Sequence, residues 1–162
     1  MDFTAFLEWL AEQPISMHIA ETWWFPLLES IHVLASTFLV GSVLMVDLRL
    51  LGVASRMQAV TRITREVLPW TRVAGLVAIV TGFGLFLANT VRYMENPAFQ
   101  IKLTLLAFAG INMAVFHLRT MRDVIEWDRS DVLPFAARFA GGFSVVLWIG
   151  ILLSGRWVGH LI

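Results

Sequence analysis

Four long apolar runs divide the chain. The first lies within residues 23–52, where residues 24–46 are long enough, at about 1.5 Å per residue, to cross a hydrocarbon core of about 30 Å. The other three lie at about 73–91, 99–118 and 139–157. Because short connections join the runs, the pattern predicts an all-α, antiparallel four-helix bundle in a membrane, with up-down-up-down topology.

The first 22 residues have a different pattern. Apolar residues recur there at the spacing of one helical face: Phe3, Phe6, Leu7 and Leu10. This spacing predicts a short amphipathic helix over 3–13 that lies on the membrane surface. We expect Pro14 to end it and 15–22 to be a connector. The chain is therefore divided into an interfacial helix with its connector, 1–22, and a transmembrane domain, 23–162.

The connections between the apolar runs are polar and basic. Val60, Ile63 and Val67 predict a short interfacial helix before the second span, which would begin as a separate element at about residue 73. Residues 92–97, with an Asn-Pro pair, predict a tight turn. Residues 119–134 predict a charged loop.

Composition narrows the protein class. Hydrophobic residues make up 58% of the chain and charged residues 15%, with a mean hydropathy of +0.75. A soluble domain of 162 residues cannot bury so much apolar surface, so we expect an integral membrane protein. The chain has no cysteine, which excludes disulfides, iron–sulfur clusters, c-type haem attachment and thiolate metal sites.

The basic residues are unevenly distributed. One side of the membrane would carry nine: Arg49, Arg56, Arg62, Arg65, Arg72, Arg119, Arg122, Arg129 and Arg138. The other would carry three: Arg92, Lys102 and Arg156. By the positive-inside rule, this asymmetry predicts that the two larger loops are cytoplasmic and that both termini lie outside.

One cluster of ionisable residues is predicted in the outer half of the membrane. Glu29 and His32 are three residues apart, so they share a face of the first span, and Lys102 enters the third span at a similar depth. The cluster could hold haem or a metal through a neutral imidazole. It could also be a Glu29–Lys102 ion pair, with His32 bonded to a neighbouring carbonyl group, or a proton relay.

Two further ionisable residues lie nearer the cytoplasmic side. His117 ends the third span and is either an interfacial side chain or a ligand or proton-transfer group. It lies about 13 Å deeper than His32, so a haem held by both imidazoles would be strained. We expect Asp47 to form a structural salt bridge with Arg119, Arg122 or Arg138.

Small residues recur along the fourth span. Ala137 and Gly141, and then Gly150 and Ser154, are spaced so that another helix could approach closely. This spacing predicts a homo-oligomer, or docking into a larger membrane complex, through that helix.

Several short motifs suggest a family. His32, Gly41 and the Leu48-Arg49-Leu50 segment, then Lys102-Leu103 and Phe116-His117, resemble the CopD-type and HemJ-type membrane proteins. The stretches LESIHVLA, DLRLLG, LPW, TGFGLF, NPAF and FH are more similar to an uncharacterised four-span bacterial inner-membrane family in that neighbourhood. HemJ-type proteins bind b-type haem and oxidise protoporphyrinogen, whereas CopD-type proteins are associated with copper uptake. Because Asp47 stands near the HemJ-type proline, we do not extend the HemJ-type reaction to this chain.

The resemblance implies a bundle in the bacterial inner membrane in which His32 and Lys102 are the functional positions and His117 the third. We expect b-type haem ligated by His32, with Glu29 or Lys102 at the haem or its propionates, and electron transfer between a quinone and a periplasmic partner. A copper-handling protein, with His32 and His117 as metal ligands, and a non-catalytic subunit of a larger complex are the alternatives. We expect contact with the lipid bilayer and none with nucleic acid.

Overall fold

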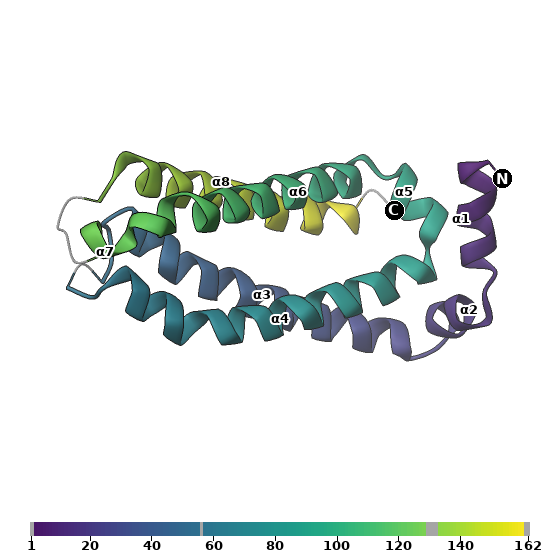
Figure 1. The fold of residues 1–162 in the computed structure, drawn as a ribbon. Coiled ribbons are helices and arrows are strands. Elements are labelled where there is room, and N and C mark those ends of the chain that lie inside the picture. The colour runs from purple at the N-terminus through teal and green to yellow at the C-terminus, as the bar shows by residue number, and fades with distance from the viewer. Residues whose placement is uncertain (1, 56, 129–132, 161–162) are drawn as a thin grey trace.

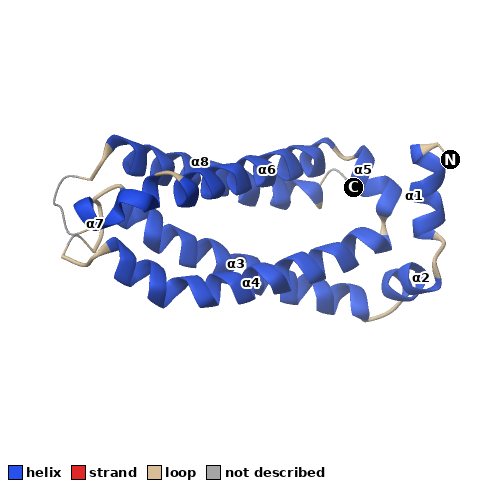
Figure 2. Ribbon diagram, viewed as in Figure 1, coloured by secondary structure: helices blue, strands red, loops and turns tan. Residues whose placement is uncertain are grey.

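The protein is a bundle of four long antiparallel helices. The computed structural model describes residues 2–55, 57–128 and 133–160, which form helices and turns and contain no β-strand. The long helices are α3 (Trp24–Leu50), α4 (Val60–Ala88), α6 (Pro97–Leu118) and α8 (Phe135–Val158) (Figures 1 and 2). Each is long and apolar enough to cross a membrane. The predicted all-α bundle of a multi-pass membrane protein is confirmed.

The four helices are arranged as two pairs. α3 packs along α4, and α6 packs along α8, while α3 also contacts α8. Both ends of the described chain lie at one end of the bundle, which we call the terminal end (Figure 1). The opposite end, which we call the loop end, carries the connections from α3 to α4 and from α6 to α8.

The loop end holds the main hydrophobic core. It consists of Leu50, Val60, Phe116, Trp127, Leu133, Ala137 and Ala140. Hydrogen bonds fix the connections around it. The Asp128 carboxylate accepts a bond of 2.8 Å from the backbone N–H of Thr61, near the start of α4. Arg49 is only 2% exposed, and its Nε donates to the Gln58 carbonyl oxygen over 2.7 Å, which ties the α3–α4 connection to α3.

Several local predictions were wrong. Pro14 does not lead into a connector but begins a second helix, α2 (Pro14–Glu21), after α1 (Phe3–Ala11), because proline is well suited to the first turn of a helix. The expected interfacial helix and second span form the single helix α4, since Val60 and Ile63 are buried in the loop end and continue its packed face.

The expected turn at 92–97 contains the short helix α5 (Thr90–Glu95), and the expected loop at 119–134 contains two more, η1 (Thr120–Asp123) and α7 (Val124–Trp127).

The N-terminal helices lie across the terminal end. α1 runs across the bundle axis and contacts α5, and α2 contacts α3 and α4 (Figure 1). Leu7 is buried against the bundle, whereas Phe3 and Phe6 stay exposed, so the apolar face is divided between protein and surroundings. A short N-terminal helix agrees with the sequence-based prediction, and its position at the membrane surface stays a prediction.

The small residues of α8 face the protein's own helices. A Cβ atom placed on Gly141 would lie 2.9 Å from the Cβ of Leu50 and 3.1 Å from the carbonyl oxygen of Asp47, both on α3. A Cβ atom on Gly150 would lie 2.9 Å from Leu105 of α6. The spacing that predicted self-association therefore serves packing within one chain. Assembly into an oligomer or larger complex stays a prediction, and this face no longer supports it.

We predict that Gly141→Ala lowers the free energy of unfolding by about 1–3 kcal/mol, because the added methyl group meets backbone and Cβ atoms that cannot move independently. Reversible unfolding in mixed micelles measures the change. Gly41→Ala is the control, since a Cβ atom there meets nothing within 4 Å. Equal stability of Gly141→Ala and the wild type would show that the contact between α3 and α8 is looser than described.

Candidate ligand-binding cavity

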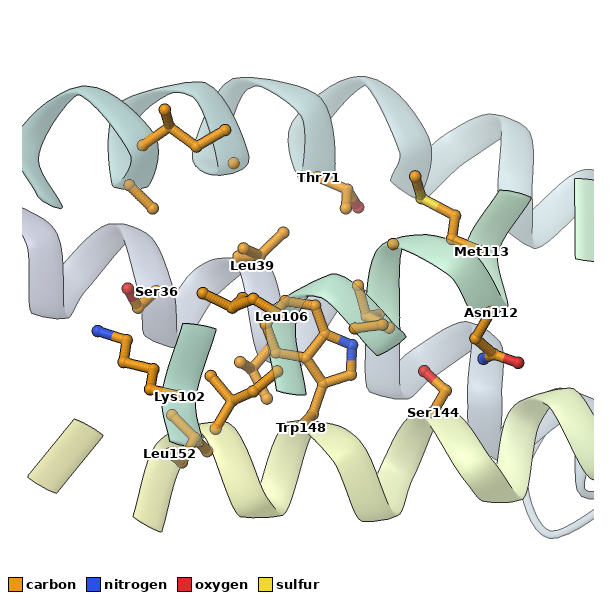
Figure 3. A pocket seen from close by; sticks show the side chains of 18 of the residues that line it. Ser36, Leu39, Thr71, Lys102, Leu106, Asn112, Met113, Ser144, Trp148 and Leu152 are labelled. Carbon is orange, nitrogen blue, oxygen red and sulfur yellow. The ribbon is translucent and has the colours of Figure 1, made fainter. Parts of the chain in front are cut away.

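A cavity of about 680 Å³ lies inside the bundle between the two helix pairs. Its lining is mostly apolar, and its size is typical of sites for small organic molecules. Lys102 and Ser36 lie toward one end, and Asn112 and Ser144 toward the other (Figure 3). The cavity therefore has a polar region toward each end, and the Thr71 hydroxyl and the Trp148 indole nitrogen lie between them (Figure 3).

His32 lines the terminal half of the cavity. Its Nδ1 lies 2.9 Å from the carbonyl oxygen of Ala78 and 3.1 Å from the hydroxyl of Thr81, both on α4. A carbonyl oxygen only accepts, so we assign the proton of the neutral ring to Nδ1. Nε2 then carries the free lone pair, and it has no hydrogen-bond partner among the described residues. This is the arrangement by which proteins orient a ligating histidine.

Gly82 makes room for this imidazole. A Cβ atom on Gly82 would lie 2.9 Å from Cε1 and 3.2 Å from Nδ1 of His32. Any side chain at this position would push the ring away from Ala78. The TGFGLF stretch thus supplies both a hydrogen-bonding hydroxyl, from Thr81, and the space beside it.

Lys102 brings a positive charge to the same region. Its half-buried side chain lines the cavity, packs 3.8 Å from the position of a Cβ atom on Gly155 of α8, and lies within electrostatic range of His32. Figure 3 shows its amino group at the end of the cavity near Ser36. Within the described parts of the chain the one ion pair is Arg62–Glu66, so Lys102 has no carboxylate partner there.

Glu29 does not join this region. Its side chain is exposed and does not line the cavity, and its charge acts instead on Tyr93 of α5. The structure therefore brings together His32 and Lys102 but not Glu29. The alternative of a Glu29–Lys102 ion pair is not formed among the described residues, although the bond from His32 to a neighbouring carbonyl group is.

His117 lies toward the other end of the cavity. It is 20 residues into α6, whereas His32 is 8 residues into α3, so their depths differ by about 18 Å (30 Å − 12 Å). Its Nδ1 lies 2.9 Å from the carbonyl oxygen of Met113 in its own helix. One metal ion cannot contact both imidazoles. No group of three His, Asp or Glu side chains that could hold a metal ion occurs in the described residues.

A comparison with known families assigns the chain to one of them. Residues 6–161 match a family of unknown function, DUF6644. The chain belongs to this family. No curated protein and no solved structure matches it. The resemblance of this DUF6644 chain to CopD-type and HemJ-type proteins therefore stays a prediction.

Sequence reasoning missed the role of Asp47 in the cavity. Asp47 is 5% exposed and lines the cavity near the loop end. Its expected partners Arg119, Arg122 and Arg138 are exposed, and none of them forms an ion pair with it. The predicted salt bridge is therefore wrong for the described part of this DUF6644 protein. A carboxylate within an apolar run was the signal in the sequence, but the sequence alone did not show which way it faced.

The position of Glu29 can be tested through Tyr93, the only tyrosine in the chain. Burial and then the negative charge of Glu29 raise the pKa of Tyr93 above its ordinary value of 10.0, while Arg92 acts in the opposite direction. We predict that Glu29→Gln lowers the pKa of Tyr93, because one charge that disfavours tyrosinate is removed. Burial still keeps this pKa above the ordinary value.

An ultraviolet absorbance titration in detergent measures the pKa of Tyr93 directly. Arg92→Gln should raise it further, and Glu21→Gln, on the exposed end of α2, is the control that should leave it unchanged. A pKa that does not move in Glu29→Gln would place Glu29 away from α5.

Proposed function

We propose that the protein binds b-type haem in the cavity, with Nε2 of His32 as the axial ligand, and that it acts in membrane electron transfer. One observation carries the proposal. Nδ1 of His32 is bonded to the Ala78 carbonyl oxygen, which leaves the lone pair of Nε2 available to bind a metal ion, and the side chain lines the cavity. Such a haem would supply a one-electron redox centre inside the bilayer.

The other residues of this region fit a haem. The lining is apolar over most of its area, as a porphyrin requires, and the stacked rings of Phe86 and Phe99 lie 5.9 Å apart in its wall. Among the described residues Lys102 has no carboxylate partner, and its positive charge near His32 suits a propionate. Since His117 lies about 18 Å away in depth, the proposal is for a haem with one imidazole ligand from this chain. A quinone and a periplasmic redox protein are the proposed electron partners.

We also propose that the terminal end is periplasmic in a bacterial inner membrane. Arg49 and Lys102 lie inside the bundle, and Arg56 and Arg129 lie outside the described residues. Of the other eight basic residues in the chain, six belong to the side of the loop end and two to the side of the terminal end. The positive-inside rule therefore still supports a cytoplasmic loop end.

A reporter that is active only in the periplasm, fused to the C-terminus, should be active, and a reporter that is active only in the cytoplasm should be silent. Fusions within the α3–α4 connection should give the reverse result. Strong cytoplasmic activity at the C-terminus would reverse the proposed orientation.

We predict that protein purified from haem-replete cells has a Soret band and gives the pyridine haemochrome spectrum of haem b. His32→Ala should lose the band, because the axial nitrogen is removed. Gly82→Ala should lower haem affinity about 10–100-fold, because the added methyl group disrupts the bond that orients His32.

Two controls match these variants. His18→Ala removes an exposed histidine of α2, and Gly75→Ala adds a methyl group to α4 at ordinary contact distance, 3.8 Å from Leu39. Both should keep the full spectrum. Colourless wild-type protein would falsify haem binding and favour a copper-handling protein or a structural subunit.

A further inference from the structure

Polar residues border the loop-end core on every spanning helix. Each helix contributes at least one residue to that core: Leu50 of α3, Val60 of α4, Phe116 of α6, and Ala137 and Ala140 of α8. Three or four residues away along each helix, toward the cavity, is a side chain with an oxygen atom: Asp47, Thr64, Asn112 and Ser144. Because one helical turn separates each pair, the four oxygen-bearing side chains lie at about the same level.

The contacts of Asp47, Asn112 and Ser144 agree with a common level. The hydroxyl of Ser144 lies within hydrogen-bonding reach of the Asp47 carboxyl group. Nδ2 of Asn112 donates to the carbonyl oxygen of Ala140 over 3.0 Å, which leaves its Oδ1 available as an acceptor. Figure 3 shows Asn112 and Ser144 near each other at this end of the cavity.

Two of these side chains have an oxygen without a partner among the described residues. Oδ2 of Asp47 and Oγ1 of Thr64 are enclosed by the protein and accept or donate no hydrogen bond there. Asp47 has no ion pair among the described residues. Nε of Arg49, two residues away, is bonded to Gln58, and Nη2 of Arg49 is enclosed without a hydrogen-bond partner among those residues. Burying a polar group without a partner is costly, especially a carboxylate in a membrane span, and such a residue points to a functional site.

We propose that Asp47, Thr64, Asn112 and Ser144 form a binding site for an alkali-metal cation at the loop end of the cavity. Carboxylate, hydroxyl and amide oxygens are ligands suited to hard cations, and this set contains no sulfur or imidazole. One carboxylate matches a single positive charge. The site is distinct from the proposed haem ligand, since 15 residues of α3 (47 − 32) separate Asp47 from His32, which is about 22 Å.

Thermal unfolding of the full chain in detergent tests the proposal. The chlorides of sodium, potassium and choline are compared at the same ionic strength. Sodium or potassium should raise the midpoint temperature by about 2 °C or more relative to choline, since a ligand that binds the folded state stabilises it. Asp47→Asn should remove this difference, and Thr64→Val should reduce it.

The variants are chosen so that misfolding cannot imitate the result. Thr64→Val removes a hydroxyl without a hydrogen-bond partner, so its stability in choline should equal that of the wild type. Thr71→Val is the matched control on α4, because the Thr71 hydroxyl also lines the cavity but donates to Val67. It should keep the full cation response, and so should His32→Ala.

No difference between the three chlorides in the wild type would overturn the site, and so would a cation response that persists in Asp47→Asn. Binding of radioactive sodium to the wild type, and its loss in Asp47→Asn, is the direct measurement. A result for haem at His32 does not affect either outcome.

Discussion

The close approach of α3 and α8 at Gly141 determines how the rest of the bundle is arranged. Because residue 141 has no side chain, the backbone of α8 can lie against Leu50 and the Asp47 carbonyl oxygen. This contact brings Ser144 to Asp47 and closes the core of the loop end. The other main contacts lie within the pairs α3–α4 and α6–α8, so space remains between the pairs for the cavity.

The hydroxyl of Thr64 differs from the other hydroxyls for which a bond within the helix is found. Several hydroxyls bond back to the carbonyl oxygen four residues earlier in their own helix, as Ser30, Thr37 and Thr104 do. This bond satisfies a polar group where no water is available. The hydroxyl of Thr64 is enclosed but makes no such bond, so its hydrogen-bonding capacity is left unused by its own helix. Asp47 and Lys102 likewise differ from the exposed charged residues of the connections, because they line the cavity and have no ion pair among the described residues.

The sequence was sufficient for the class, the number of spans and the approximate positions of the helices, because membrane spans are long and their apolar composition is unmistakable. It was also sufficient to select His32 and Lys102, since ionisable residues within spans are rare. The direction in which a residue faces was not available from the sequence. Glu29 lies three residues from His32 in the same helix but is exposed. A helix face covers about one-third of the circumference, and the neighbouring helices determine which part of the helix surface is covered.

Other sequence-based predictions were wrong or incomplete for the same reason. The roles of Gly82 and Gly141 depend on which side chain or backbone lies opposite, and the sequence does not give the register between helices. Asp47 was assigned to a salt bridge because arginines follow α6 and begin α8, but those arginines extend outward from the bundle. Pro14 was read as the end of the first helix, although it begins α2.

Asn96 connects the start of α6 to the end of α8. Its Oδ1 accepts from the backbone N–H groups of Ala98 and Phe99 at the start of α6, and its Nδ2 donates to the Val158 carbonyl oxygen at the end of α8. One buried side chain thus fastens α6 to α8 at the terminal end, while the loop-end core joins both pairs. The start of α6 and the end of α8 therefore depend on the same side chain, so a change at residue 96 would loosen both helix ends together.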